Sequence, residues 1–204
     1  MSPDTKSFPA SRARIHFAGV GGQGTLTATT LLSRAALEAG LAVVSGEIHG
    51  MAQRGGVVES SVLLGGWTSS VISKGEADII LGFEAMETLR ALPYLRQGGA
   101  VFSSTDFVAP PGVSSGKESA PDLAAVQKLV GGCVEKAWFL PCRELGIQAG
   151  SAQCANTVLL GALCATDLIP FGPEELKGTI TRHLPARLVD MNLKAVDLGV
   201  AAVS

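Results

Sequence analysis

The chain alternates between short apolar runs and longer segments whose apolar residues recur every three or four positions. The first pattern is typical of buried strands, and the second is typical of helices that cover a core. Strands are therefore predicted at 14–18, 41–47, 57–64, 77–83, 99–104 and 136–140. Helices are predicted at 25–39, 84–92, 123–129, 156–165, 173–183 and 188–200, with a turn or short helix at 144–150. This alternation predicts an α/β fold, a three-layer α/β/α Rossmann-like domain whose sheet is mixed and mostly parallel.

The prediction of a mixed sheet depends on residues 57–72. The strand at 57–64 is followed by Gly65 and Gly66 and then by a short extended piece at 67–72. Two extended pieces joined by a pair of glycines are typical of an antiparallel hairpin. Such a pair within an otherwise parallel sheet makes the sheet mixed.

A glycine-rich turn joins the first predicted strand to the first predicted helix. Its residues include Gly19, Gly21, Gly22, Gln23 and Gly24, in a G-x-G-x-x-G pattern. Residues without a Cβ allow positive φ and close approach of a ligand, and the free N–H groups at a helix start attract an anion such as phosphate. The turn therefore predicts a phosphate-binding site. The alternative is a tight strand-to-helix turn that binds nothing.

A second polar stretch occupies residues 48–56, where a crossover helix would begin in a regular β-α-β unit. It carries His49, Gln53 and Arg54 and ends in Gly55 and Gly56. A guanidinium beside glycines is suited to a phosphate or carboxylate ligand, which can then approach the backbone. Two alternatives stay open: Arg54 pairs with a neighbouring acid on a surface hairpin, and His49 is a structural hydrogen-bonding residue rather than a catalyst.

Three acidic residues stand near predicted strand ends. Glu47 lies 23 positions after Gly24, close to where a nicotinamide-binding fold carries the acid that holds a ribose. Glu84 and Glu87 are one helical turn apart after the strand at 77–83, so they share a face at the edge where open α/β sheets place their sites. Their alternative role is to complement the dipole of the helix that they open.

Length and composition favour one domain. We assign residues 1–13 to a flexible leader and residues 14–204 to a single domain. Charged residues make up only 17% of the chain, so part of the surface is expected to be buried against another subunit. The formal charge of −2 disfavours a nucleic-acid partner. No apolar run is long enough to span a bilayer and the start of the chain is too polar for a secretory signal, which indicates a cytoplasmic protein without a membrane partner.

Several kinds of catalytic and metal site are excluded by spacing. Cys133, Cys142, Cys154 and Cys164 contain no C-x-x-C pair, so neither a zinc ribbon nor an iron–sulfur motif is encoded, and we expect buried, reduced thiols. The histidines are far apart, so no metal site is predicted. The G-x-S-x-G and G-x-x-x-x-G-K-[ST] motifs are absent, which disfavours hydrolysis of esters by that nucleophile and of nucleotides. The chain therefore offers a binding scaffold without a catalytic set of its own, and residues 106–121 form an exposed loop long enough for a lid or docking segment.

Taken together, these stretches resemble the gamma domain of the 2-oxoacid:ferredoxin oxidoreductases. The similarity lies in the glycine turn, in the H-G-M-A-Q-R-G-G sequence of residues 49–56 and in residues 75–84. It also includes Asn156 with residues 160–162 and the closing stretch from Asn192 to Gly199, so it extends from about residue 14 to residue 200. Within the family, the chain is most similar to the small (beta) subunits of indolepyruvate:ferredoxin oxidoreductases.

The resemblance implies a part in the oxidative decarboxylation of a 2-oxoacid with coenzyme A, which yields acyl-CoA, carbon dioxide and reduced ferredoxin. Thiamine diphosphate, Mg²⁺ and [4Fe-4S] clusters are then expected on a large partner subunit, so this chain would carry no catalytic residue and be inactive alone. The turn around Gly21, Gly22 and Gln23, with the loop bearing Gln53 and Arg54, would face the partner's active site or the phosphates of coenzyme A. Ferredoxin is a further partner that the resemblance implies, and the chain expressed alone could form a homodimer.

Alternatives to this reading stay open. The chain could serve as the gamma subunit of a pyruvate or 2-oxoglutarate ferredoxin oxidoreductase. It could also be a stand-alone dinucleotide-binding protein with Glu47 on the ribose, or a purely structural adaptor whose Arg54 has no effect on coenzyme A dependence.

Overall fold

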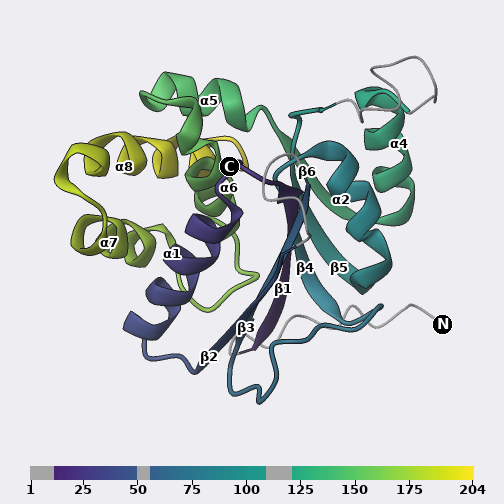
Figure 1. Cartoon of the computed structure of the whole chain (residues 1–204), viewed down its shortest axis with the longest axis horizontal. Helices are drawn as coiled ribbons and strands as arrows, with labels where there is room; N and C mark the ends of the chain where they lie inside the picture. Colours follow the sequence, from purple (N-terminus) through teal and green to yellow (C-terminus); the bar gives the residue numbers. More distant parts are fainter. Residues whose placement is uncertain (1–11, 50–55, 109–120) are drawn as a thin grey trace.

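A computed structural model describes residues 12–49, 56–108 and 121–204 of the chain. Within these ranges, six strands form one sheet in the order β2-β3-β1-β4-β5-β6 (Figure 1). The strands are β1 (Ala13–Val20), β2 (Val43–His49), β3 (Val57–Leu64), β4 (Ala77–Gly82), β5 (Leu95–Ser104) and β6 (Lys136–Leu140). The strands β1, β4, β5 and β6 are parallel, whereas β3 lies antiparallel between β2 and β1. The prediction of a mixed, mostly parallel sheet is confirmed.

The hairpin predicted between residues 57–64 and 67–72 does not form; the antiparallel partners of β3 are other strands. Residues 67–72 form no strand, and β3 instead pairs with β2 on one side and with β1 on the other. Both edges of β3 are therefore occupied, which leaves no ladder for a further strand. The following segment packs beside the sheet through single bonds: Trp67 Nε1 donates to the Leu64 carbonyl at 2.9 Å, and Ser61 Oγ donates to the Ser70 carbonyl at 2.6 Å.

Helices cover both faces of the sheet. Figure 1 shows α1, α5, α6, α7 and α8 on one face and α2 and α4 on the other. The elements are α1 (Thr25–Glu38), α2 (Ala85–Ala91), η1 (Leu92–Tyr94), α4 (Leu123–Cys133), α5 (Cys142–Ala149), η2 (Ala152–Cys154), α6 (Ala155–Cys164), α7 (Pro173–His183) and α8 (Ala186–Ala201). Successive residues of β1 face opposite layers, with Phe17 in the core under α1 and Ala18 in the core under α2. The predicted three-layer α/β/α arrangement is confirmed.

Several element boundaries differ from the predicted ones by a few residues. Strand β1 begins at Ala13, which the sequence placed in the leader, and residues 1–11 lie outside the described part of the chain. Helix α5 begins at Cys142, and β5 begins at Leu95. Periodicity marks the buried centre of an element better than its ends, because end residues depend on tertiary contacts.

Helices α6 and α8 approach each other closely at two glycines. A Cβ built on Gly161 would lie 2.5 Å from the Val196 carbonyl oxygen, and one built on Gly199 would overlap the Val158 carbonyl oxygen. Only residues without side chains allow backbones to come this near. The contact presses α8 against α6, and α6 in turn packs on the sheet.

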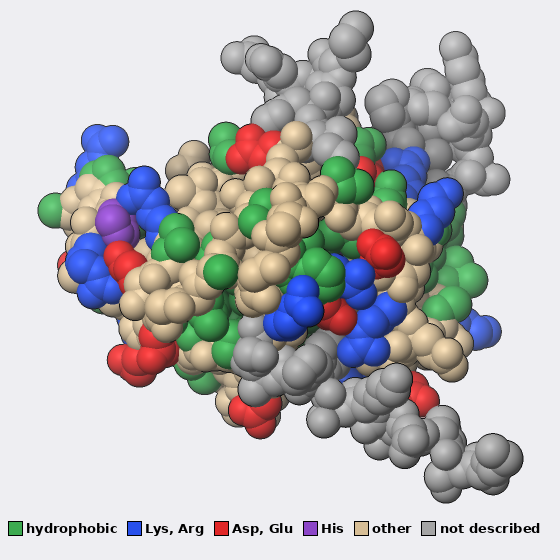
Figure 2. All heavy atoms as spheres, turned by 90° about the horizontal axis from the view of Figure 1, so that it is seen from below, with side chains coloured by type: hydrophobic (Ala, Val, Ile, Leu, Met, Phe, Trp, Pro, Cys, Tyr) green, Lys and Arg blue, Asp and Glu red, His purple; other side chains and the backbone are tan. Residues whose placement is uncertain are grey.

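Charges on the surface are mixed in sign. Figure 2 shows basic and acidic side chains interspersed on the face seen from below. Arg96 Nε lies 2.6 Å from Asp78 Oδ1, and Arg14 pairs with both Asp78 and Glu76. The basic side chains of Arg14 and Arg96 are therefore paired with acids.

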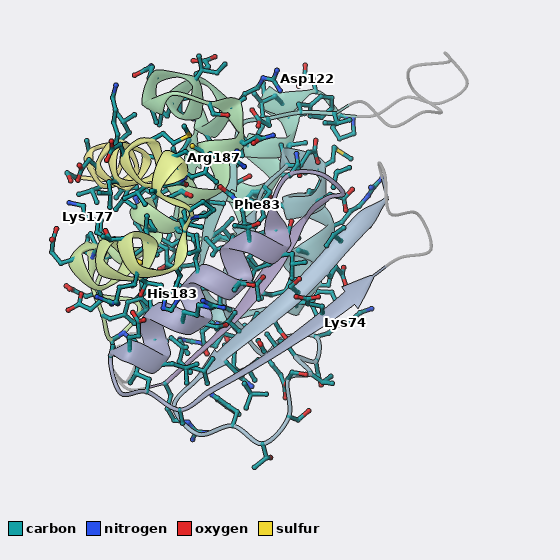
Figure 3. All side chains as sticks on the ribbon, turned by 60° about the vertical axis from the view of Figure 1, so that its left-hand side comes forward. Lys74, Phe83, Asp122, Lys177, His183 and Arg187 are labelled. Atoms are coloured by element: carbon teal, nitrogen blue, oxygen red, sulfur yellow. The ribbon has the colours of Figure 1, made fainter. Side chains whose placement is uncertain are left out.

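A cluster around Glu38 joins the end of α1 to the end of α7. The Glu38 carboxylate accepts hydrogen bonds from Thr179 Oγ1 at 2.5 Å, from His183 Nε2 at 2.7 Å and from the Arg182 guanidinium. Figure 3 places His183 at the end of α7 beside α1. The hydrogen bond from Arg182, followed by those from Thr179 and His183, lowers the pKa of Glu38 to about 2.

This cluster predicts a stability loss in acid. A carboxylate whose folded pKa lies below its unfolded pKa stabilises the fold above the unfolded pKa, and the contribution disappears as the pH falls from about 4.5 through about 2. We expect Glu38→Gln to flatten the pH dependence of the urea midpoint in this window. Glu174→Gln removes a carboxylate from α7 outside the cluster and should keep the slope of the unaltered chain. An unchanged slope in Glu38→Gln would contradict the prediction.

Candidate functional site

A cavity of about 690 Å³ opens where the strands β1, β4 and β5 end at their carboxyl termini. Its wall is formed by part of the glycine turn, by Ser104 at the end of β5 and residues 106–108 after it, and by parts of α5, η2, α6 and α8. This is the edge at which open α/β sheets place their ligands. Its volume falls within the range of roughly 300–1,000 Å³ that is common for small-molecule sites.

Part of the glycine turn lies in this wall, whereas Gly19 and Gly21 are not among the lining residues. Gly22 and Gly24 have φ values of 101° and 79°, and with Gln23 they line the cavity. The Gln23 side chain folds back, so that its Oε1 accepts from the Val20 N–H at 2.8 Å. A Cβ on Gly19 would lie 3.0 Å from that same oxygen, so Gly19 supports the turn from behind. The turn therefore presents its backbone to the cavity rather than the Gln23 amide oxygen.

Three helices begin at the cavity wall: α1 after Gly24, α5 at Cys142 and α6 at Ala155. Among the described residues, no side chain caps the starts of α1 and α5, whereas Glu84 caps α2 and Asp122 caps α4. Helix α6 continues from η2, which Ser151 caps, and Asn156 Oδ1 accepts from the Thr157 N–H in its first turn. Uncapped helix starts carry free N–H groups and a partial positive charge. The cavity is therefore electrostatically suited to an anionic ligand.

One cation and one acid also contribute to the electrostatic potential in the cavity. Arg143 in the first turn of α5 and Asp106 after β5 are the charged side chains of the described cavity wall. Burial raises the pKa of Asp106, and the nearby Arg143 charge opposes that rise. Arg143 is exposed at the rim, where a guanidinium can reach a phosphate or carboxylate of a bound ligand.

The rest of the wall is apolar or weakly polar. Phe83, Leu159, Leu188 and Met191 line it, and Figure 3 shows Phe83 near the middle of the molecule, close to α1. Such a wall suits a ligand that has both a charged and an apolar part. Cys142 also lines the cavity, but burial raises the pKa of its thiol to about 12, so it is not a thiolate nucleophile at neutral pH.

Two buried amides and a hydroxyl connect the glycine turn to α6 and α8. Asn156 Nδ2 donates to the Gly24 carbonyl at 3.1 Å, and Asn156 Oδ1 accepts from the Thr157 N–H at 2.7 Å. The Thr157 hydroxyl lies 2.6 Å from Asn192 Oδ1 and 3.2 Å from Asn156 Oδ1. Asn156 and Asn192 both line the cavity. Sequence reasoning assigned neither to the site, although an asparagine within an apolar helix is a signal that it could have used.

Part of the second predicted stretch lies outside the described residues. Gln53, Arg54 and Gly55 are in this group, and His49 is the last residue of β2. Gly56 is described, and its carbonyl accepts from the Gly21 N–H at 2.9 Å. This bond brings the end of the loop against the glycine turn. The two stretches therefore meet at this contact, and the site roles of Gln53 and Arg54 stay predictions.

The structure does not bring Glu47 to the glycine turn. Strand β3 separates β2 from β1, and through the shared partner Ser60 Glu47 stands level with Phe17 in the middle of β1. Glu47 is also not part of the cavity wall. The prediction of a ribose-binding acid is therefore wrong in its geometry, because that role requires a strand directly beside β1.

Glu84 and Glu87 hold the backbone near the cavity instead of lining it. Glu84 Oε2 accepts from the Glu87 N–H at 2.9 Å, and Glu84 Oε1 accepts from the Val108 N–H at 2.8 Å. Glu87 pairs with Arg90 at 2.5 Å. Burial raises the pKa of Glu84, against the effect of these hydrogen bonds. Glu84 thus caps α2, a role close to the predicted complement of the helix dipole, and its bond to Val108 fixes residues that form the cavity wall.

The remaining predictions concern thiols, metals and membranes. Cys142, Cys154 and Cys164 are buried free thiols as expected, but Cys133, the last residue of α4, is exposed. Within the described ranges, no three metal-binding side chains gather at one point. None of the helices in those ranges combines the length and apolar character needed to cross a bilayer.

Comparison with protein families identifies relatives over nearly the whole chain. The family described as pyruvate ferredoxin/flavodoxin oxidoreductase matches residues 14–202. The indolepyruvate oxidoreductase subunit IorB of Pyrococcus horikoshii is 42% identical over 186 residues, which cover 90% of this chain and 92% of the relative. The subunit of the same name from Archaeoglobus fulgidus is 36% identical over 188 residues, which cover 92% and 94%.

Solved structures share the fold at lower identity. The gamma subunit of a keto/oxoacid ferredoxin oxidoreductase from Geobacter sulfurreducens superimposes with a TM-score of 0.68 at 22% identity, covering 94% of this chain and 98% of that chain. A 2-oxoglutarate:ferredoxin oxidoreductase from Magnetococcus marinus, with 2-oxoglutarate, coenzyme A and succinyl-CoA bound, matches with a TM-score of 0.69 at 21% identity. That match covers 95% of this chain and 31% of the larger one.

Proposed function

Because the chain belongs to the pyruvate ferredoxin/flavodoxin oxidoreductase family, we propose that it is the small subunit of an indolepyruvate oxidoreductase. The observation that carries this proposal is the 42% identity with such a subunit over 90% of the chain. The assembled enzyme would convert an aryl-pyruvate, coenzyme A and oxidised ferredoxin to acyl-CoA, carbon dioxide and reduced ferredoxin. The ketoisovalerate and 2-oxoglutarate enzymes supply more distant relatives, at 25–29% identity.

This chain would supply binding surface while its partner supplies the reacting groups. The residues present do not fit an iron–sulfur cluster, because Cys133, Cys142, Cys154 and Cys164 belong to four different elements. We therefore assign the clusters, thiamine diphosphate and Mg²⁺ to a large partner subunit. When bound there, these groups carry the decarboxylation and the electron transfer to ferredoxin.

Coenzyme A is the ligand whose chemistry suits the cavity. The uncapped starts of α1 and α5, with Arg143 at the rim, fit its phosphates. The apolar wall around Leu188 and Met191 fits its pantetheine arm. The chain itself would bind and orient the coenzyme, exclude water from its arm and leave the reacting thiol toward the partner.

Surface residues around the cavity support assembly with a partner. Leu26 in the first turn of α1, Val57 at the start of β3 and Val108 in the cavity wall expose 49%, 41% and 52% of their surface. Val57 stands opposite Val20, directly before the glycine turn. Exposed apolar residues next to a ligand cavity are typical of a subunit interface. A large subunit seated here would close the cavity from outside.

Co-expression tests the proposal. The purified chain alone is expected to show no viologen reduction with indolepyruvate and coenzyme A. Co-expression with a large subunit that binds thiamine diphosphate and iron–sulfur clusters should restore reduction that depends on both substrates. Activity of the isolated chain, or a complex that turns over without coenzyme A, would count against the proposal.

Arg143→Ala tests the assignment of coenzyme A to this cavity. Loss of one charge-assisted hydrogen bond to a phosphate at an exposed rim should raise the KM for coenzyme A about tenfold. The KM for indolepyruvate should stay the same, because that substrate reacts at the partner's thiamine diphosphate. Lys128→Ala removes an exposed cation from α4 on the opposite layer and serves as the control. Equal KM values in both variants would remove Arg143 from the site.

A further inference from the structure

Three polar side chains lie inside the helical layer next to the cavity. Asn156, Thr157 and Asn192 expose only 5%, 1% and 8% of their surface, and the rest of α6 is apolar and buried. Burial of an amide or a hydroxyl is costly unless its hydrogen bonds are replaced. The close contact of α6 with α8 is made elsewhere, at Gly161 and Gly199. The polar residues are thus not needed to bring the two helices together.

Their hydrogen bonds connect α8 to the glycine turn through the first residues of α6. Asn192 Nδ2 donates to the Leu188 carbonyl of its own helix at 2.8 Å, which fixes the orientation of the amide. Its Oδ1 accepts from the Thr157 hydroxyl at 2.6 Å, and the same hydroxyl lies 3.2 Å from Asn156 Oδ1, where its one hydrogen is shared more weakly. Asn156 Oδ1 also accepts from the Thr157 N–H at 2.7 Å. Asn156 Nδ2 donates to the Gly24 carbonyl. Thr157 thus contacts Asn192 on one side and orients the Asn156 amide on the other, so the contacts continue from α8 to the turn.

The last acceptor in this chain starts helix α1. The Gly24 carbonyl that receives Asn156 Nδ2 also accepts from the Ala28 N–H at 2.9 Å, the first hydrogen bond of α1. A Cβ on Gly24 would lie 2.5 Å from Asn156 Nδ2, so the amide is seated directly against the turn. A shift of Asn156 would therefore move the turn that presents free N–H groups to the cavity.

We propose that Thr157 and Asn192 are positioning residues that hold the glycine turn in place through Asn156. Thr157 does not line the cavity, and Asn192, which does, acts on the turn through its bond to Thr157. They fix the carbonyl of Gly24 and, with it, the direction in which the uncapped start of α1 faces the cavity. The position of the turn depends only on contacts within this chain, so it can be measured without the partner subunit. The consequence for coenzyme A affinity rests on the proposed function.

Hydrogen exchange of the turn tests the proposal in the isolated chain. Thr157→Val keeps the shape of the side chain but removes the bridging hydroxyl, and Thr157→Ser keeps the hydroxyl. The amides of Val20, Gln23 and Ala28 report on the turn, because their acceptors lie within it. We expect these amides to exchange about tenfold faster in Thr157→Val and at the original rate in Thr157→Ser.

Thr179→Val is the matched control. Thr179 is an equally buried helical threonine whose hydroxyl donates to a side chain of another helix, Glu38, away from the cavity. Its loss should lower stability without selectively accelerating the three amides. Equal acceleration in Thr157→Val and Thr179→Val would overturn the proposal. If Thr157→Val does not fold, Asn192→Leu removes the acceptor of the same hydroxyl and is judged by the same amides.

The assembled enzyme provides the second readout. Thr157→Val should raise the KM for coenzyme A several-fold and leave the KM for the 2-oxoacid unchanged, with recovery in Thr157→Ser. An unaltered complex without coenzyme A dependence would reject the proposed function, while the exchange rates would still decide the role of Thr157. Selective exchange without any change in the KM for coenzyme A would overturn the functional part of the positioning role.

Discussion

Gly199→Ala is expected to lower the free energy of unfolding by about 2–3 kcal/mol, because the added methyl overlaps the Val158 carbonyl oxygen of α6. That obstacle is backbone within a fully buried helix, so it cannot move aside as a flexible side chain would. Helix α8 must shift away from α6, and the packing of both helices loosens. For a chain of this size, the loss corresponds to a decrease in Tm of roughly 4–12 °C.

Gly131→Ala is the control for this prediction. Gly131 lies inside α4, and no atom lies within 4 Å of the position where its Cβ would be. An alanine there reduces the entropy of the unfolded chain and should raise stability by up to about 1 kcal/mol. Thermal unfolding of the two variants side by side separates the steric effect from the general effect of replacing a helical glycine. Equal Tm values would contradict the close contact of α6 with α8.

Gly24→Ala is expected to decrease the kcat/KM of the assembled enzyme for coenzyme A by about 100-fold, since a displacement of roughly 1 Å at a positioning group has effects of that size. Gly24 has a φ of 79°, which costs a residue with a side chain about 1–2 kcal/mol. The new Cβ would in addition lie 2.5 Å from Asn156 Nδ2. The turn and Asn156 cannot both keep their places.

Gly40→Ala separates backbone strain from displacement. Gly40 follows α1 with a φ of 81°, and no atom lies near its Cβ position. The two variants therefore share the same conformational strain and differ in the clash with Asn156. In both variants the positive φ should lower the free energy of unfolding by a similar amount, but only Gly24→Ala should lose turnover with coenzyme A. Steady-state kinetics at matched folded fractions make the comparison, and equal activities would show that the turn does not act at the site.

Much of the fold could be predicted because its elements are encoded locally. The predicted strand at 57–64 and the predicted helix at 173–183 coincide with β3 and α7, since period and flanking residues mark such elements. The order of the strands could not be predicted in the same way. The insertion of β3 between β2 and β1 depends on which ladders form over long distances in the chain, and apolar runs are the same for every order.

The candidate site was predicted in part for the same reason. The glycine turn was found because positive φ at Gly22 and Gly24 requires a particular residue type. Arg143 and Asp106 were missed, since an isolated charge in a sequence is indistinguishable from an ordinary surface residue. Glu47 was misplaced because its spacing from Gly24 matched a sheet order that this chain does not adopt.

The sequence by itself determined the α/β class, the glycine turn, the uncapped start of α1 and the absence of cysteine motifs, because each depends on residues that are neighbours along the chain. The tertiary structure alone decided which distant groups meet. Gly24, Asn156 and Asn192 come from three helix regions and form one hydrogen-bonded chain beside the cavity. Local preferences act over a few residues, whereas such contacts form only when burial of the apolar faces brings the helices together.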